Sequence, residues 1–149
     1  MSVIAEFAAE IARVEARLRA IRAERTTREI RPGGWRGTEV LGHLIDSALN
    51  NHQRFVRAAL EGTYAGPGYH QPGWVQAHGY AEVSWADLLA LWRSENSLLT
   101  RVVTRIPEER LSAPCRVGDK EPTPLAAVIE GYLQHLLHHL AQLERLNAA

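Results

Sequence analysis

Apolar residues recur every three or four positions in four stretches of the chain, the spacing that places side chains on one face of an α-helix. These stretches cover residues 4–21, 38–60, 84–106 and 123–147. No repeat occurs, and no stretch alternates strongly enough to predict strands that build a sheet. We therefore expect an all-α protein with four helices in one bundle, as a single domain over residues 1–149. We also expect each helix to bury its apolar seam against antiparallel neighbours.

Several residues mark the ends of these helices. Gly62 is expected to stop the second helix, and the hydroxyl of Ser84 can cap the third. Thr123 is expected as the N-cap of the fourth helix, with Pro124 at its first helical position.

Two of the predicted connections between helices are long. Residues 61–83 join the second and third helices through a loop rich in glycine, proline and tyrosine. A loop of that length in a small domain is usually functional or partly mobile. His70 and His78 lie in it, and we expect them to face solvent or to stabilise the loop. Residues 111–122 predict either a short hairpin or an irregular loop.

Charge and cysteine content exclude some classes of partner and site. The chain has 17 lysines and arginines and 17 aspartates and glutamates, so no net field attracts nucleic acid or an anionic membrane. No apolar run is long enough to span a membrane, and the N-terminus does not resemble a signal peptide, so we expect a cytoplasmic protein. Cys115 is the single cysteine, which excludes an internal disulfide and a multi-cysteine zinc site. It lies in a predicted loop, and we expect it to be incidental.

Two histidines of the fourth helix have the spacing of a metal site. His135 and His139 are four residues apart, so their rings stack on one flank of the helix and can hold one ion. The same spacing is compatible with half-buried histidines bonded to backbone or water. In the second helix, periodicity places His43 on a polar face with Asp46, away from the apolar stripe. The chain has no di-iron Glu-x-x-His pairs, no His-Glu-x-x-His motif, no phosphate-binding glycine loop and no serine nucleophile elbow.

Short motifs then occur in a fixed order: Arg31-Pro-Gly-Gly-Trp35, Val40-Leu-Gly-His43-Leu-Ile-Asp46-Ser47, Asn50-Asn51, Arg54-Phe55, Tyr132-Leu-Gln-His135, His138-His139 and Gln142. With these motifs the chain resembles the DinB/YfiT-like superfamily of metal-dependent hydrolases, from about residue 31 to residue 143. The resemblance implies a four-helix bundle whose divalent metal ion is held by three histidines, here His43, His135 and His139. It also implies that His138 is not a ligand and that His43 faces a polar groove between helices.

The resemblance implies more than one possible function. An ion on three histidines with open positions supports hydrolysis or activation of a thiol, so we expect a metal-dependent hydrolase with a small-molecule substrate. One alternative is a transferase or isomerase that uses a low-molecular-weight thiol such as bacillithiol, mycothiol or glutathione. Another is a non-catalytic metal-binding bundle of stress-response type. Zinc or nickel is the expected metal, with iron and manganese left open. We expect the substrate beside Trp35, Tyr69 and Trp74, and the resemblance also implies a homodimer.

Three further polar residues have predicted roles. Asp46, one turn after His43, could orient that imidazole or a metal-bound water, or could be solvated at the surface. His52 lies on the apolar stripe of the second helix and is expected as a hydrogen-bonded core histidine. Glu95 interrupts the apolar seam of the third helix and is expected to pair with an arginine such as Arg54.

Overall fold

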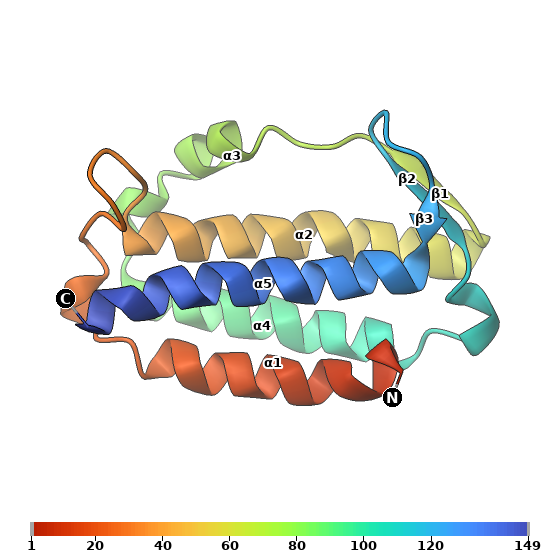
Figure 1. The fold of residues 1–149 in the computed structure, drawn as a ribbon, viewed down its shortest axis with the longest axis horizontal. Helices are drawn as coiled ribbons and strands as arrows, with labels where there is room; N and C mark the ends of the chain where they lie inside the picture. Colours follow the sequence, from red (N-terminus) through yellow and green to blue (C-terminus); the bar gives the residue numbers. More distant parts are fainter. Residues whose placement is uncertain (1, 149) are drawn as a thin grey trace.

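Four long helices form a bundle in the computed structural model, which describes residues 2–148 (Figure 1). They are α1 (Val3–Arg19), α2 (Gly37–Glu61), α4 (Trp85–Thr104) and α5 (Leu125–Ala148). Their apolar stripes meet in one core, where Phe7, Trp92 and Leu136 are among the largest fully buried side chains. The predicted four-helix bundle is confirmed. None of the described helices is long and apolar enough to cross a membrane.

The helices begin and end close to the predicted positions. Gly62 ends α2 in the left-handed conformation, with a φ of 77°, which glycine adopts without strain. The hydroxyl of Ser84 accepts a hydrogen bond of 3.1 Å from the backbone N–H of Asp87 at the start of α4. The predicted cap of the last helix is wrong, because Thr123 and Pro124 pair as a strand and α5 begins at Leu125.

The helices are not arranged around the bundle in chain order. The main contacts of α1 are with α4 and α5, and α2 also packs on α4 and α5, so α1 and α2 are diagonally opposite. Figure 1 shows α1 and α5 running in one direction and α2 and α4 in the other. Half of the neighbouring pairs are therefore parallel, and the prediction of antiparallel neighbours holds only for the other half. Apolar periodicity fixes which face of a helix is buried, but it carries no information about direction.

The long connection between α2 and α4 is a consequence of this arrangement. Because the two helices are parallel neighbours, the chain must return along the length of the bundle before α4 can begin. It returns along the outside of α2 through strand β1 (Tyr64–Gly66), helix α3 (Gln71–His78) and the 3-10 helix η2 (Tyr80–Glu82) (Figure 1). We call residues 62–84 the crossover segment. The sequence indicated only a loop here, because the 8 residues of α3 are too few to show a helical period.

Three short strands cover one end of the bundle. β1 pairs in parallel with β2 (Pro114–Val117), and β2 pairs in antiparallel with β3 (Thr123–Pro124). Of the two alternatives for residues 111–122, the hairpin is the one found. The expectation that no strands build a sheet is wrong, because strands of 2 to 4 residues are too short to show alternation. The other connections contain the 3-10 helices η1 (Ala23–Arg25) and η3 (Glu108–Arg110).

The crossover segment buries a face of α2 that the sequence assigned to solvent. Every residue from Leu41 to Ala48 is buried, so α2 presents no solvent-exposed face over these two turns. α4 and α5 cover two sides of the helix, and α3 and η2 cover the remainder. The ring of Tyr80 lies so close to Gly42 that a Cβ atom there would overlap it.

Candidate metal centre

Three imidazole rings from two helices converge inside the bundle. His43 projects from the second turn of α2, and His135 and His139 project from successive turns of α5. One nitrogen of each ring lies within 4.8 Å of the other two, and the Nε2 atoms of His43 and His135 are 3.0 Å apart. The structure thus brings together the three histidines that the sequence singled out. His138 is exposed and outside this group, because adjacent residues of a helix point about 100° apart.

Burial favours the neutral form of all three rings. Burial, reinforced by the two neighbouring rings, lowers the pKa of His43 to about 3. Burial also lowers the pKa of His135 to about 4, with smaller effects of His139 and His138. The pKa of His139 is lowered by burial too, although its hydrogen bond to Gln142 opposes the shift. Neutral imidazoles keep a ring lone pair free, which is the form that binds a metal ion.

A hydrogen bond sets the tautomer of His139. Its Nδ1 lies 2.9 Å from Gln142 Oε1, and because a carbonyl oxygen only accepts, Nδ1 carries the proton and donates it. The free lone pair of His139 is then on Nε2, on the other side of the ring. Metal-binding histidines are commonly oriented by such a bond from their second nitrogen.

The geometry of the group fits a divalent ion. In tetrahedral coordination with bonds of about 2.0–2.1 Å, two histidine nitrogens are separated by about 3.3–3.4 Å. The separation of 3.0 Å between the Nε2 atoms of His43 and His135 is close to this value. His43 is 1% exposed, so its lone pair is shielded from water. Within residues 2–148 no other group of three or more histidine, cysteine or acidic side chains converges in this way.

Asp46 is buried and bonded to the crossover segment. Its Oδ1 accepts a hydrogen bond of 2.7 Å from the hydroxyl of Tyr80 and lies 3.1 Å from His78 Nδ1. Burial raises the pKa of Asp46, against the opposing effects of these two partners. The alternative of a surface-solvated Asp46 is therefore wrong. No hydrogen bond joins it to His43 among the described residues, and its contacts instead tie the crossover segment to α2.

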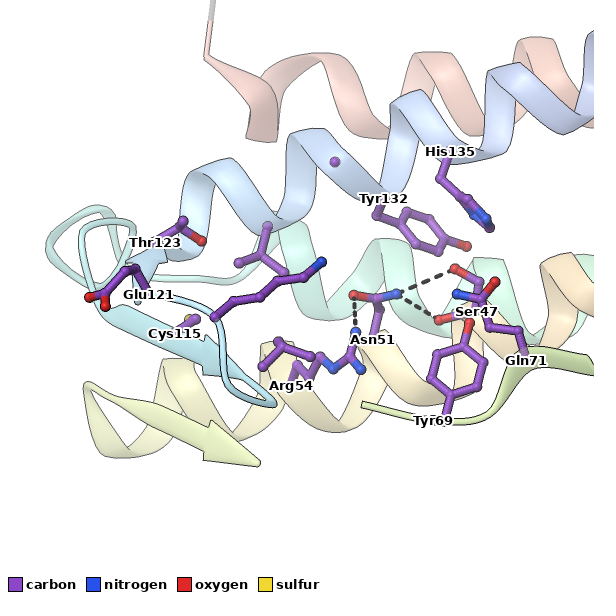
Figure 2. A pocket seen from close by; sticks show the side chains of 14 residues that line it. Ser47, Asn51, Arg54, Tyr69, Gln71, Cys115, Glu121, Thr123, Tyr132 and His135 are labelled. Atoms are coloured by element: carbon purple, nitrogen blue, oxygen red, sulfur yellow. Dashed lines mark hydrogen bonds between the residues drawn. The ribbon is translucent and has the colours of Figure 1, made fainter. Parts of the chain in front are cut away.

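Two of the three histidines line hollows. His135 lines a cavity of about 360 Å³ together with Arg54, Tyr69 and Tyr132 (Figure 2). His139 lines a second hollow of about 560 Å³, together with Trp35 and Gln142.

The three aromatic residues that were expected beside one substrate do not line the same hollow. Trp35 lines the second hollow, and its ring centroid is 5.0 Å from that of His43. Tyr69 lines the first cavity, and Trp74 packs on Tyr69 with 5.3 Å between centroids.

Other predicted residues have roles away from the three rings. His52 Nδ1 lies 2.5 Å from Glu95 Oε1, so these two half-buried side chains form a hydrogen bond between α2 and α4. The predicted pairing of Glu95 with Arg54 is wrong. His70 caps α3, where its Nδ1 accepts a bond of 3.1 Å from the N–H of Gly73, which is a loop-stabilising role.

Cys115 is buried in β2 and not in a loop. Burial raises the pKa of its thiol, so nothing in its surroundings activates it as a nucleophile. This agrees with the expectation that it is incidental to the chemistry.

The sequence analysis missed a buried polar stripe on α2. Ser47, Asn51 and Arg54 follow His43 at steps of four, four and three, and all four side chains are buried. The spacing of this stripe was visible in the sequence. Its burial was not, because the covering residues come from α5 and the crossover segment.

A four-helix bundle with a parallel crossover and a three-histidine group between two helices defines the class of this protein. The family model of the DinB superfamily matches residues 6–143, and the chain belongs to this superfamily.

Similar proteins of known sequence come from Bacillus species. YfiT of Bacillus subtilis, named as a candidate metal-dependent hydrolase, is 26% identical over 118 residues, which cover 78% of this chain and 66% of YfiT. A candidate metal-dependent hydrolase of Bacillus mycoides is 30% identical over 124 residues, or 78% of this chain and 69% of that protein. The chain thus spans about two thirds of the length of these relatives.

Two solved structures share the fold. The structure of Bacillus subtilis YfiT, described as having an unusual four-helix bundle topology, matches with a TM-score of 0.86 at 23% identity. The match covers 97% of this chain and 86% of YfiT. A mycothiol-dependent maleylpyruvate isomerase matches with a TM-score of 0.77 at 10% identity, covering 95% of this chain and 59% of the isomerase.

Proposed function

We propose that this chain is a metal-dependent hydrolase of a small molecule, with a divalent ion held by His43, His135 and His139. The observation that carries the proposal is the convergence of three imidazole nitrogens within 4.8 Å of one another. The names of the Bacillus relatives support the reaction class. Zinc and nickel suit three nitrogen ligands best, iron is compatible, and manganese prefers oxygen ligands.

The number of ligands supports a catalytic role over a purely structural one. Structural zinc sites are closed by four protein ligands, whereas catalytic sites have three and keep a position open. The described residues offer three side chains here, and a cavity of about 360 Å³ begins at His135. A stress-response bundle in which the ion only stiffens the fold needs no such cavity.

The residues around the three histidines orient these side chains and hold the crossover segment in place. An ion bound here polarises a carbonyl group and lowers the pKa of a water or a thiol. Gln142 keeps the Nε2 of His139 directed at the site, and the ring of Trp35 covers His43. The contacts of Asp46 with Tyr80 and His78 hold the crossover segment over α2.

A second candidate is a thiol-dependent transferase or isomerase. The fold shared with a mycothiol-dependent isomerase supports it. An ion held by His43, His135 and His139 would also bind the thiolate of a cosubstrate. The thiol would have to come from a low-molecular-weight cosubstrate, because Cys115 is buried and its pKa is raised.

Metal analysis of single-histidine variants tests the ligand set. Protein purified without added metal should contain about one divalent ion per chain by mass spectrometry, as expected for a three-histidine site. His43→Ala, His135→Ala and His139→Ala should each lose the ion, whereas the matched control His138→Ala should retain it. Loss of metal in His138→Ala with retention in His43→Ala would overturn the assignment.

A substrate panel then separates the two reaction classes. Ester and amide substrates report hydrolysis, and conjugation assays with bacillithiol, mycothiol and glutathione report thiol transfer. Metal-dependent turnover of only the thiol substrates would replace the hydrolase proposal with the second candidate. Bound metal without turnover of either set supports the non-catalytic bundle.

A further inference from the structure

Arg54 is a buried cation with no counter-ion in the part of the chain that the structure describes. Its side chain is 9% exposed, and no carboxylate of residues 2–148 lies within ion-pair distance of the guanidinium group. Its single side-chain hydrogen bond is a long one of 3.4 Å, from Nη1 to Asn51 Oδ1. A guanidinium has five N–H donors, and burying a charge is costly unless it is paired. Most of the donors of Arg54 therefore have no acceptor among residues 2–148.

Asn51 holds this guanidinium in position. Its amide nitrogen donates to the backbone oxygen of Ser47 at 2.9 Å and to the hydroxyl of the same residue at 3.3 Å. These bonds direct Asn51 Oδ1 toward Arg54, as the dashed lines in Figure 2 show. The guanidinium also packs on the ring of Tyr69, with its central carbon 5.9 Å from the ring centroid. Such a fixed fork is suited to two parallel hydrogen bonds with a carboxylate or a phosphate.

Arg54 and His135 line the same cavity of about 360 Å³ (Figure 2). Lys120 adds a second positive charge to its wall, and Glu121 is the single acidic residue of the lining. In Figure 2, Glu121 lies at the opposite end of the cavity from His135. Asp119 lines only the neighbouring hollow, which Arg54 and Lys120 also border. The wall of the cavity thus carries two positive charges and one negative charge, and the negative charge lies at the end away from His135.

We propose that Arg54 binds an anionic group of the substrate, a carboxylate or a phosphate, while the reacting group of the same molecule lies at the three histidines. The proposal rests on the proposed hydrolase function for the identity of the reacting end. The substrate is then a small anion whose charge sits several bonds from the scissile group. Arg54 is in this view a specificity residue, and the ion need not be present for it to bind an anion.

A purely structural role for Arg54 makes a different prediction. If its contact with Tyr69 only anchors the crossover segment, replacing Arg54 lowers stability without changing which ligands bind. The matched control is Arg57, which lies one turn further along α2, is exposed, and bonds Gln53 at 3.2 Å.

Nuclear magnetic resonance of the metal-free protein tests anion binding directly. The Nε–Hε signal of Arg54, assigned by its loss in Arg54→Gln, is followed during titration with benzoate, phenyl phosphate and the neutral benzamide. Both anions should shift this signal saturably and benzamide should not, and the tighter of the two anions identifies the preferred group. The variants of Arg54 lack this signal, so their binding is followed by the backbone amides of Asn51 and Gly131, which line the cavity. Arg54→Gln should weaken anion binding about 30-fold, as for a charge-assisted hydrogen-bonded pair, and Arg54→Lys should weaken it less. Arg57→Gln should leave it unchanged.

Kinetics of the zinc-loaded protein test the same residue in catalysis. The substrates are the monophenyl ester of succinate, which carries a carboxylate, and phenyl butyrate, which does not. Arg54→Gln should lower the ratio of kcat/KM for the charged over the neutral ester about 30-fold, mainly through KM.

The outcomes separate this proposal from the proposed hydrolase function. Anion binding that depends on Arg54, without metal-dependent turnover of either ester, upholds the anion site and removes the hydrolase function. Equal binding of benzoate and benzamide, or anion binding that survives Arg54→Gln, overturns the anion site. A lowered melting temperature of Arg54→Gln with unchanged anion binding assigns Arg54 to the structural role.

Discussion

The metal-free protein should lose stability steeply as the pH falls below the ordinary histidine range. His43 and His135 have pKa values lowered to about 3 and about 4 in the folded chain, chiefly by burial. In the unfolded chain both rings take up protons near pH 6.5. The unfolded state therefore binds more protons than the folded state between pH 6.5 and pH 4, and the free energy of unfolding falls as protons are added.

The size of the effect follows from the number of rings. Each histidine that stays neutral only in the folded state contributes about 1.4 kcal/mol per pH unit below its unfolded pKa. His43 and His135 together give about 2–3 kcal/mol between pH 6.5 and pH 5.5, with His139 acting in the same direction. That is a large share of a typical total stability of about 5–15 kcal/mol. For a chain of this length it lowers the melting temperature by roughly 8 °C.

Urea denaturation of the metal-free protein at the two pH values measures this difference. His43→Gln should reduce the pH dependence by about one proton, because one buried ring is removed. Because the variant keeps every other titratable group, its comparison with the wild type isolates the contribution of His43. Equal stability of the wild type at both pH values, or an unchanged slope in His43→Gln, would refute the reasoning. Acid should also release bound metal, and full retention at about pH 4.5 contradicts three-histidine ligation.

Four further predictions concern the fold and the assembly of the chain. Gly42→Ala should lower the free energy of unfolding by at least about 2 kcal/mol, because its Cβ overlaps the ring of Tyr80. Gly131→Ala, whose Cβ has nothing within 4 Å, should raise it by up to about 1 kcal/mol in the same denaturation assay. Tyr80→Phe removes the hydroxyl that donates to buried Asp46 and should lower the free energy of unfolding by about 1–3 kcal/mol. Hydrogen exchange should become faster in the crossover segment only. The predicted homodimer should appear in sedimentation at micromolar concentration, and a monomer there removes that prediction without affecting the bundle.

The bundle was predictable because its helices are long and strongly periodic. The seam from Phe7 to Leu18 and the stop at Gly62 are local features, and each is found in the structure as the sequence indicates. The short elements were not predictable in the same way. β1 depends on a pairing partner distant in the chain, as in the pairing of Tyr64 with Cys115, and α3 is too short to show a helical period.

The burial of His43 could not be derived from its own helix. Its neighbours Asp46 and Ser47 are polar, so periodicity placed all three on a solvated face. The rings beside His43 are those of Trp35 and of His135 and His139 on α5, and Tyr80 covers Asp46. None of these contacts is encoded in the pattern of α2. The pairing of Glu95 with His52 instead of Arg54 has the same origin, since it depends on the parallel alignment of α2 and α4.

The parallel alignment of α2 and α4 also explains why the polar stripe of α2 is buried. Because α2 and α4 run in parallel, the crossover segment must pass along the outer side of α2, and it covers the polar stripe from His43 to Arg54 on the way. The three histidines are fixed on rigid bundle helices, whereas Tyr69 and Lys120, which line the cavity beside them, come from the crossover segment and the β2–β3 turn. Rigid helices hold ligand geometry better than loops do, and loops tolerate sequence change. A bundle connected in this way can therefore keep one metal centre while the connections around it determine which small molecule it accepts.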